Sequence, residues 1–133
     1  MLFRSAIDPV PERRVMAESL GAEAFDVGEH GITRIGELTG GRGADAVMEL
    51  VGIPAAQELA YRLIRPGGVM SVIGCHCTPH FAFSPVDAYD KNLTYRTGRC
   101  PARHYMDRLT ETVLAGELDV EPFITHEIGR AHV

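Results

Sequence analysis

The 133-residue sequence predicts an α/β fold built on a doubly wound parallel sheet, and two observations lead to this class. First, two short apolar runs, 46–51 and 69–73, flank a segment with helical periodicity, 55–65. Two strands joined through a helix form a parallel βαβ unit, whose crossover is right-handed in nearly all proteins. Second, strand and helix patterns alternate along the rest of the chain, as they do in sheets covered by helices on both faces.

Within the central unit, the sequence also predicts where each element ends. The apolar run 46–51 stops at Gly52, and the run 69–73 stops at Gly74. Pro54 suits the first turn of the intervening helix, where the missing N–H would have no partner anyway. The segment 66–68, Pro-Gly-Gly, is expected to end that helix.

The other elements are expected in a regular order on both sides of this unit. Ile7 and Asp8 are predicted to be the last step of a strand whose beginning is missing. Before the central unit we expect a helix over 12–20 closed by Gly21, a strand over 23–27, a helix over 32–39 and a turn over 40–43. After it we expect a long loop over 75–90, a strand over 91–97, a helix over 103–118 and an extended segment over 119–127.

Composition narrows the classes of partner. The net charge is −5 and the basic residues are scattered, which argues against a nucleic-acid partner, since that needs a basic face. No apolar stretch approaches the ~20 residues of a membrane span, and the N-terminus lacks a signal-peptide core, so a cytoplasmic location is the default expectation. Cys75, Cys77 and Cys100 are expected to be free thiols, and the run Cys75-His76-Cys77 matches no zinc-ligand spacing.

Ligands of doubly wound sheets bind beyond the carboxyl ends of the strands, and this rule selects the candidate site. Asp8 would accept hydrogen bonds from the adenosine ribose there, although an aspartate that only starts a turn with Pro9 is the alternative. Arg13 would flank the adenine or a phosphate, unless it is solvated helix surface. The other candidates follow the later strands: Leu50, Val51, Gly52, Ile73, Gly74, Cys75, Thr97 and Gly98.

An ordered set of segments resembles one known family. The segments are DPVPERR (8–14), LGA (20–22), LTGGRGADAVMELVG (38–52), RLIRPGGVMSVIG (62–74), YDKNLTYRTGRCPARHYMD (89–107) and PFITHEI (122–128). Together they resemble the cofactor-binding domain of zinc-type, medium-chain alcohol dehydrogenases, especially the formaldehyde- and threonine-dehydrogenase-like members. We therefore expect residues 6–127 to form a partial, Rossmann-like NAD(P)-binding domain.

The resemblance implies an oxidoreductase that transfers hydride between a nicotinamide cofactor and a small alcohol or aldehyde. The Asp8 carboxylate would repel a 2′-phosphate, so NAD is expected rather than NADP. By position, residues 50–52 would line the adenine and ribose, while residues 73–75 and 97–98 would border the nicotinamide. Such enzymes commonly form homo-oligomers, and their zinc lies in another domain.

The departures from this family are as informative as the match. The chain lacks the family's first strand, its glycine-rich turn and the domain with the zinc ligands. Residues 1–5 and 128–133 resemble sequencing-adaptor DNA translated in frame, so we expect both ends to be non-native. The chain alone is predicted to be inactive and to bind NAD weakly at best. A stand-alone, non-catalytic nucleotide-binding module and a methyltransferase-like domain are the alternatives.

Overall fold

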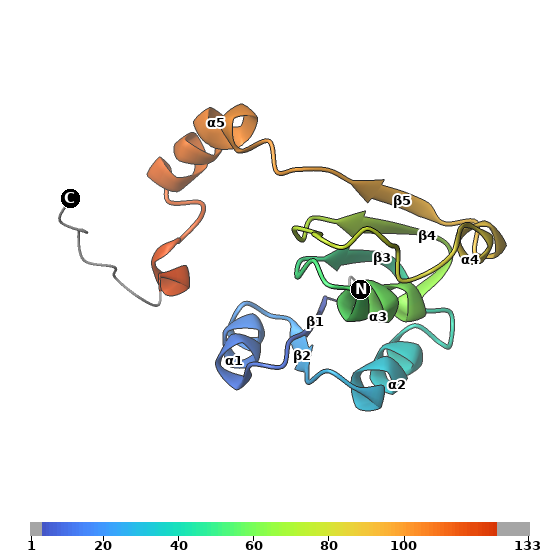
Figure 1. Ribbon diagram of the computed structural model, residues 1–133. Coiled ribbons are helices and arrows are strands. Elements are labelled where there is room, and N and C mark those ends of the chain that lie inside the picture. The colour runs from blue at the N-terminus through green and yellow to red at the C-terminus, as the bar shows by residue number, and fades with distance from the viewer. Residues whose placement is uncertain (1–3, 125–133) are drawn as a thin grey trace. The chain divides into compact units, whose positions relative to one another are not determined.

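A computed structural model describes residues 4–124, which fall into two compact units that divide between Arg99 and Cys100. The elements of the first unit are β1 (Ser5–Ile7), α1 (Pro11–Ser19), β2 (Glu23–Phe25), α2 (Glu29–Leu38), β3 (Ala44–Glu49), α3 (Pro54–Leu63), β4 (Ile64–Val72), α4 (Pro85–Asp90) and β5 (Thr94–Thr97) (Figure 1). The second unit contains α5 (Ala102–Leu114) and the 3-10 turn η1 (Glu121–Phe123). The alternation of strands and helices in the first unit confirms the predicted α/β class.

All strand pairs of the first unit are parallel, but the strands form two hydrogen-bonded sheets instead of one. β1 pairs with β2, while β4 lies between β3 and β5. Within residues 4–124, β1 and β3 therefore each have one edge without a strand partner. In the dinucleotide-binding strand order 3-2-1-4-5-6, the first strand separates the second from the fourth. The break between the two sheets matches the expected absence of that first strand.

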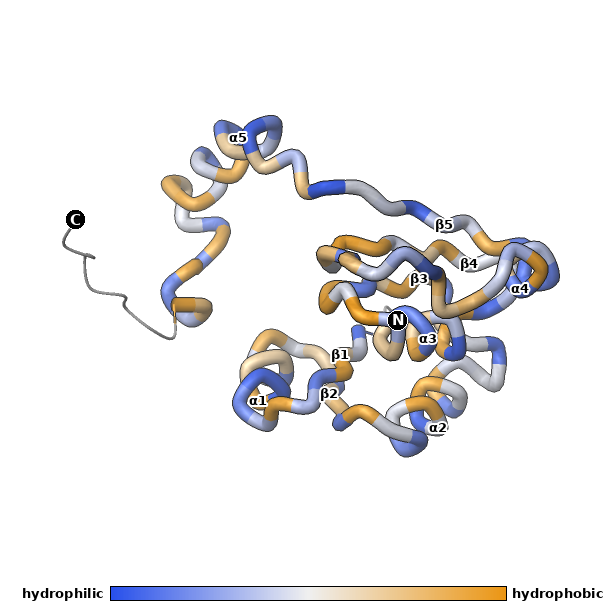
Figure 2. The backbone as a smooth tube through the Cα atoms, viewed as in Figure 1, coloured by the Kyte–Doolittle hydropathy of each residue, from blue (hydrophilic) through white to orange (hydrophobic). Residues whose placement is uncertain are grey.

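Two hydrophobic clusters hold the first unit together, and helix α3 contributes to both. Ala60 belongs to a cluster with Ile64, Met70 and Val72. Leu63 belongs to a second cluster with Phe25 and Ile35, against which Ile7, Ala44 and Val47 pack. Figure 2 shows hydrophobic and hydrophilic residues alternating along the helices, the pattern of helices that bury one face. The second cluster contains residues of both sheets, so it joins them without backbone hydrogen bonds.

The boundary between α3 and β4 differs from the prediction. We expected the helix to continue to residue 65 and the strand to begin at 69, but the helix ends at Leu63 and the strand begins at Ile64. Ile64 pairs with Ala44, and the ladder then shifts register before Ala46 pairs with Val69. This irregularity accommodates the Pro-Gly-Gly segment, in which Gly67 adopts a φ of 70°.

A second correction concerns the predicted loop over 75–90, which contains the short helix α4. Ser84 caps this helix: its hydroxyl accepts a hydrogen bond from the Asp87 N–H, and the Asp87 carboxylate accepts one from the Ser84 N–H. Pro85 follows at the first helical position. A serine followed three residues later by an acidic residue is a capping-box signal, and it outweighs the irregular composition of the segment.

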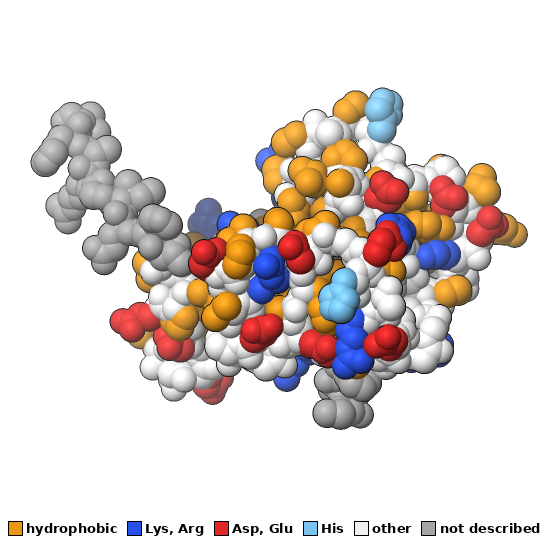
Figure 3. Space-filling model, turned by 90° about the horizontal axis from the view of Figure 1, so that it is seen from below, with side chains coloured by type: hydrophobic (Ala, Val, Ile, Leu, Met, Phe, Trp, Pro, Cys, Tyr) orange, Lys and Arg blue, Asp and Glu red, His pale blue; other side chains and the backbone are white. Residues whose placement is uncertain are grey.

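Charged side chains on the first unit form pairs of opposite sign. Arg62 lies 2.7 Å from Glu29, Arg65 lies 2.6 Å from Asp45, and Arg34 lies 2.8 Å from Glu23. Acidic and basic side chains lie next to one another across the face shown in Figure 3. This distribution agrees with the scattered basic residues noted in the sequence.

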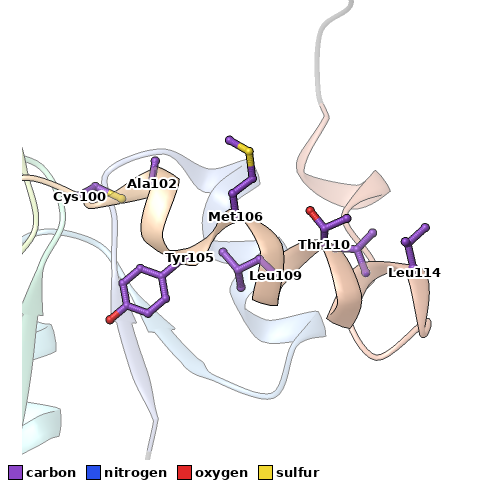
Figure 4. Close-up of a pocket in the computed structure, with 8 residues that line it drawn as sticks. Cys100, Ala102, Tyr105, Met106, Leu109, Thr110 and Leu114 are labelled. Carbon is purple, nitrogen blue, oxygen red and sulfur yellow. The ribbon is translucent and has the colours of Figure 1, made fainter.

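In the second unit, α5 presents an apolar groove along its surface. Tyr105, Met106 and Leu109 project from the helix and line this groove (Figure 4). The helix ends at Leu114, four residues before the predicted end, and Gly116 follows with a φ of 72°. At 13 residues it is the longest described helix, and no helix within residues 4–124 is long and apolar enough to cross a bilayer.

The predicted extended segment over 119–127 is wrong in its described part. Residues 121–123 form the 3-10 turn η1 instead of an extended strand. Pro122 occupies an early position of this turn, and the Asp119 carboxylate accepts a hydrogen bond from the Glu121 N–H. Residues 125–127 of this segment lie outside the described residues, as do residues 1–3 and 128–133 of the predicted non-native ends.

Candidate functional site

Apart from Arg13, which lies in helix α1, the predicted site residues lie at or beyond the carboxyl ends of parallel strands. Asp8 follows β1, residues 50–52 follow β3, and residues 73–75 follow β4. Thr97 is the last residue of β5, and Gly98 comes next. Because β3, β4 and β5 are parallel neighbours, their carboxyl ends share one edge of the three-stranded sheet.

The ends of β3 and β4 approach each other so closely that glycine is required on both. A Cβ atom on Gly52 would lie 2.6 Å from the carbonyl oxygen of Cys75, and Gly52 also has a φ of 90°. A Cβ atom on Gly74 would overlap the backbone nitrogen of Gly52. The structure therefore brings residues 50–52 and 73–75 together as one backbone junction.

Glu49, the last residue of β3, is the centre of this junction, and the sequence analysis did not single it out. Its side chain is only 2% exposed. One carboxylate oxygen accepts hydrogen bonds from the N–H groups of Val51 and Gly52, both at 2.8 Å. Its backbone carbonyl accepts two more, from Ile73 at 2.8 Å and Gly74 at 3.0 Å. One residue therefore bonds to both strand ends.

His76 completes the set of groups around this carboxylate. Its Nε2 lies 2.8 Å from the second carboxylate oxygen of Glu49. Burial opposes ionisation of Glu49, but the hydrogen bonds from Gly52, His76 and Val51 outweigh it and lower the pKa of this carboxyl below its usual range. The sequence analysis left His76 as an uninformative strand-end residue; the structure gives it a buried ionic partner.

The cysteines beside His76 show no bond to one another. Cys75, Cys77 and Cys100 are free and exposed, as predicted. Within residues 4–124, no group of three or more histidine, cysteine, aspartate or glutamate side chains is arranged to hold a metal ion.

The two carboxylate oxygens of Asp8 contact different neighbours. Oδ1 accepts a hydrogen bond of 2.8 Å from the Val10 N–H, which is the turn role weighed as the alternative in the sequence. Oδ2 lies 3.5 Å from Arg13, whose own side chain is 70% exposed. Within residues 4–124 no backbone N–H donates to Oδ2, and the carboxylate is partly open to solvent, so Oδ2 can accept hydrogen bonds from a ligand.

Apolar side chains lie open beside the strand ends. Leu50 and Val51 are each 63% exposed, and Ile73 is 44% exposed. Next to β5, Gly98 has open space where a side chain would be, with nothing within 4 Å of an added Cβ. Such a surface suits a flat, largely apolar ring, and Asp8 offers hydrogen-bond acceptors of the kind that ribose hydroxyls need.

Comparison with known proteins gives the same family from sequence and from structure. The profile of the family described as zinc-binding dehydrogenase matches residues 5–115. Zinc-type alcohol dehydrogenase B of Aspergillus flavus is 46% identical over 127 residues, covering 93% of this chain and 28% of that protein. A probable zinc-binding alcohol dehydrogenase of Mycobacterium tuberculosis is 31% identical, covering 90% of this chain and 31% of that protein.

Solved structures agree with the sequence relatives. Alcohol dehydrogenase TADH from Thermus sp. ATN1 superimposes with a TM-score of 0.81 at 35% identity, covering 90% of this chain and 36% of that one. Zinc-dependent alcohol dehydrogenase 2 from Streptococcus pneumonia gives a TM-score of 0.76 at 27% identity, covering 89% of this chain and 34% of that one. The chain thus spans about a third of the length of the proteins it matches, and it belongs to the zinc-binding dehydrogenase family.

Proposed function

We propose that this chain supplies part of the nucleotide-binding domain of an NAD-dependent oxidoreductase that acts on a small alcohol or aldehyde. The observation that carries the proposal is the set of ligand-compatible residues at the strand ends of a chain that belongs to the zinc-binding dehydrogenase family. When bound, NAD supplies hydride transfer, while the protein binds and orients it. Alone, the chain is proposed to be inactive and to bind NAD weakly.

In this proposal Asp8 holds the adenosine ribose. Its Oδ1 remains bonded to the Val10 N–H and stabilises the turn, while Oδ2 accepts hydrogen bonds from the ribose hydroxyls. A fixed carboxylate at this position repels a 2′-phosphate, which favours NAD over NADP. Arg13, 3.5 Å from Oδ2, flanks the adenine.

The open apolar residues complete the proposed binding surface. Leu50 and Val51 lie beside the adenine and ribose, next to Gly52. Residues 73–75 and 97–98 border the nicotinamide. The exposure of Ile73 and the open space at Gly98 support this assignment, since both leave room for a planar ring.

Zinc does not fit the described part of the chain. Residues 4–124 provide no cluster of three or more metal-ligating side chains, and the three cysteines are spaced as single exposed thiols. The proposal therefore assigns any catalytic zinc to residues other than 4–124. It also includes a homo-oligomeric parent enzyme, which light scattering on that enzyme would test.

The substitution Asp8→Ser tests the proposal in the longer dehydrogenase to which it assigns this chain. We expect the ratio of kcat/KM for NAD to that for NADP to fall by about tenfold or more, because removing one charge repulsion of this kind relieves at least ~1.4 kcal/mol. The measurement is steady-state kinetics with both cofactors.

Asp26→Ser is the matched control for that experiment. Asp26 is also an aspartate just beyond a strand of the same sheet, β2, and its side chain is exposed. The control variant should keep the wild-type cofactor ratio. An unchanged ratio in Asp8→Ser would remove Asp8 as the ribose ligand and would leave the preference for NAD without a physical basis.

A further inference from the structure

We propose that Glu49 is a positioning residue of the nucleotide site, acting through a clasp that consists of Glu49, Val51, Gly52 and His76. This inference rests on the proposed function, because it concerns how the strand ends assigned to the cofactor are held in place. Glu49 itself is buried and is not a contact for the cofactor.

The first step of the argument is that the clasp joins two chain segments that are distant in sequence. The Glu49 carboxylate bonds to the N–H groups of Val51 and Gly52 on its own strand end. It also bonds to His76, 27 residues further along the chain, on the end of the neighbouring strand. The exposed Val51 and Ile73 therefore belong to two loops that share one buried acceptor.

The second step is that the Glu49 carboxylate is shielded from solvent. Glu49 is 3% exposed, and no buried side-chain nitrogen or oxygen atom within residues 4–124 lacks a partner. Loss of the carboxylate would leave the N–H groups of Val51 and Gly52 without an acceptor in a junction packed too tightly for a Cβ atom. The β3 end would have to reorient its peptide groups, and the side chains of Leu50 and Val51 would move with them.

The third step is that the Glu49 carboxylate is neutralised by hydrogen-bond donors of the junction itself. Cys75 and Cys77 lie on either side of His76 on the same loop, and both thiols are exposed. A buried carboxylate with three donors, one of them an imidazole, is satisfied as an anion. The clasp is therefore complete without any ligand, so it can be tested with and without cofactor.

Three substitutions separate the contributions to the clasp. Glu49→Leu removes both carboxylate oxygens and keeps the backbone carbonyl. Glu49→Gln keeps one side-chain oxygen for the two N–H groups but removes the charge. His76→Gln leaves the carboxylate in place. Glu58→Gln is the matched control, since Glu58 is an exposed carboxylate on the neighbouring helix α3.

The first measurement is a ¹⁵N–¹H spectrum of the full 133-residue chain without cofactor. His76→Gln should shift the amide resonances of Val51 and Gly52, although these residues lie on the other strand end. Glu58→Gln should leave them unchanged. Unshifted resonances in His76→Gln would overturn the coupling of the two strand ends.

The second measurement is the kinetics of the longer dehydrogenase that carries the same substitutions. KM for NAD should rise about tenfold in Glu49→Leu, with a smaller change in kcat. In Glu49→Gln, which keeps one acceptor oxygen, KM should be much closer to the wild-type value. A KM within about twofold of wild type in every variant would overturn the positioning role. If Glu49→Leu does not fold, Glu49→Gln and His76→Gln decide the question. If Asp8→Ser leaves the cofactor preference unchanged, Asp8 is not the ribose ligand and the proposed NAD preference fails. The spectra recorded without cofactor still test the clasp independently.

Discussion

At the scale of single residues, identical amino acids have opposite physical roles in this chain. Gly74 has no space for a side chain, because an added Cβ would overlap the backbone of Gly52. Gly36 lies inside helix α2, and a Cβ atom added there would have nothing within 4 Å. The first glycine is required by packing, whereas the second only adds conformational freedom to the unfolded chain.

These two glycines give a paired prediction. Gly74→Ala should lower the free energy of unfolding by about 2 kcal/mol, because the β3 and β4 ends must move apart to admit the methyl group. Gly36→Ala should raise it by about 0.5–1 kcal/mol, since alanine is the better helix former. Urea denaturation of both variants measures these values. Equal effects of the two substitutions would contradict the tight junction.

At the scale of elements, α4 shows how local polar chemistry can form a helix where hydrophobic periodicity is weak. The helix has only six residues and none is buried. Its capping box provides two reciprocal hydrogen bonds, and the N–H and hydroxyl groups of Ser84 lower the pKa of the Asp87 carboxyl. Because this pKa is lowered by folding, the stabilisation is present at neutral pH and is lost as the pH falls through the lowered value.

Removal of the cap tests this explanation. Ser84→Ala should lower the free energy of unfolding at pH 7 by about 1 kcal/mol, the usual effect of losing an N-cap side chain. Ser19→Ala is the control, because the Ser19 hydroxyl is exposed and donates to the carbonyl of Met16 in its own helix. The control should change stability by less than about 0.5 kcal/mol. A similar loss in both variants, measured by urea denaturation, would show that the capping box is not the cause.

At the scale of the first unit, the two sheets differ in how well their strands are supported. β1 and β2 are three residues each, and among the described strands they pair only with one another. β4 is nine residues long, has a strand on both sides and contains Met70, which is fully buried. An edge without a partner leaves backbone groups open to water, so the β1–β2 pair should open more readily than the larger sheet.

Hydrogen exchange provides the measurement for this difference. The amides of β1 and β2 should exchange faster than the amides of β4 around Met70, by about tenfold or more, because local opening costs less free energy in the smaller sheet. The control is β5, an edge strand of the larger sheet, which should show intermediate protection. Equal protection in β2 and β4 would mean that both sheets open as one cooperative unit.

The places of the candidate site residues could be predicted only where local sequence marks the end of a strand. Gly52 and Gly74 lie at strand ends because short apolar runs stop there, and those stops are visible in the sequence. Thr97 ends a strand that alternation and β-forming residues predict. Glu49 was missed although a signal existed: it is an acidic residue inside an apolar run, three positions before Gly52. Its partner His76 had no such signal, since nothing local links residues 27 positions apart.

The sequence by itself determined the α/β class, the parallel βαβ unit and the family, because periodicity, turn residues and motif order are local properties that survive without coordinates. Only the tertiary structure decided that the strands form two sheets, that Ile64 joins β4, and that Glu49 reaches across to His76. These features depend on which strand edges find partners and which buried polar groups meet. Such pairings are set by contacts between distant parts of the chain, where local propensity carries no information.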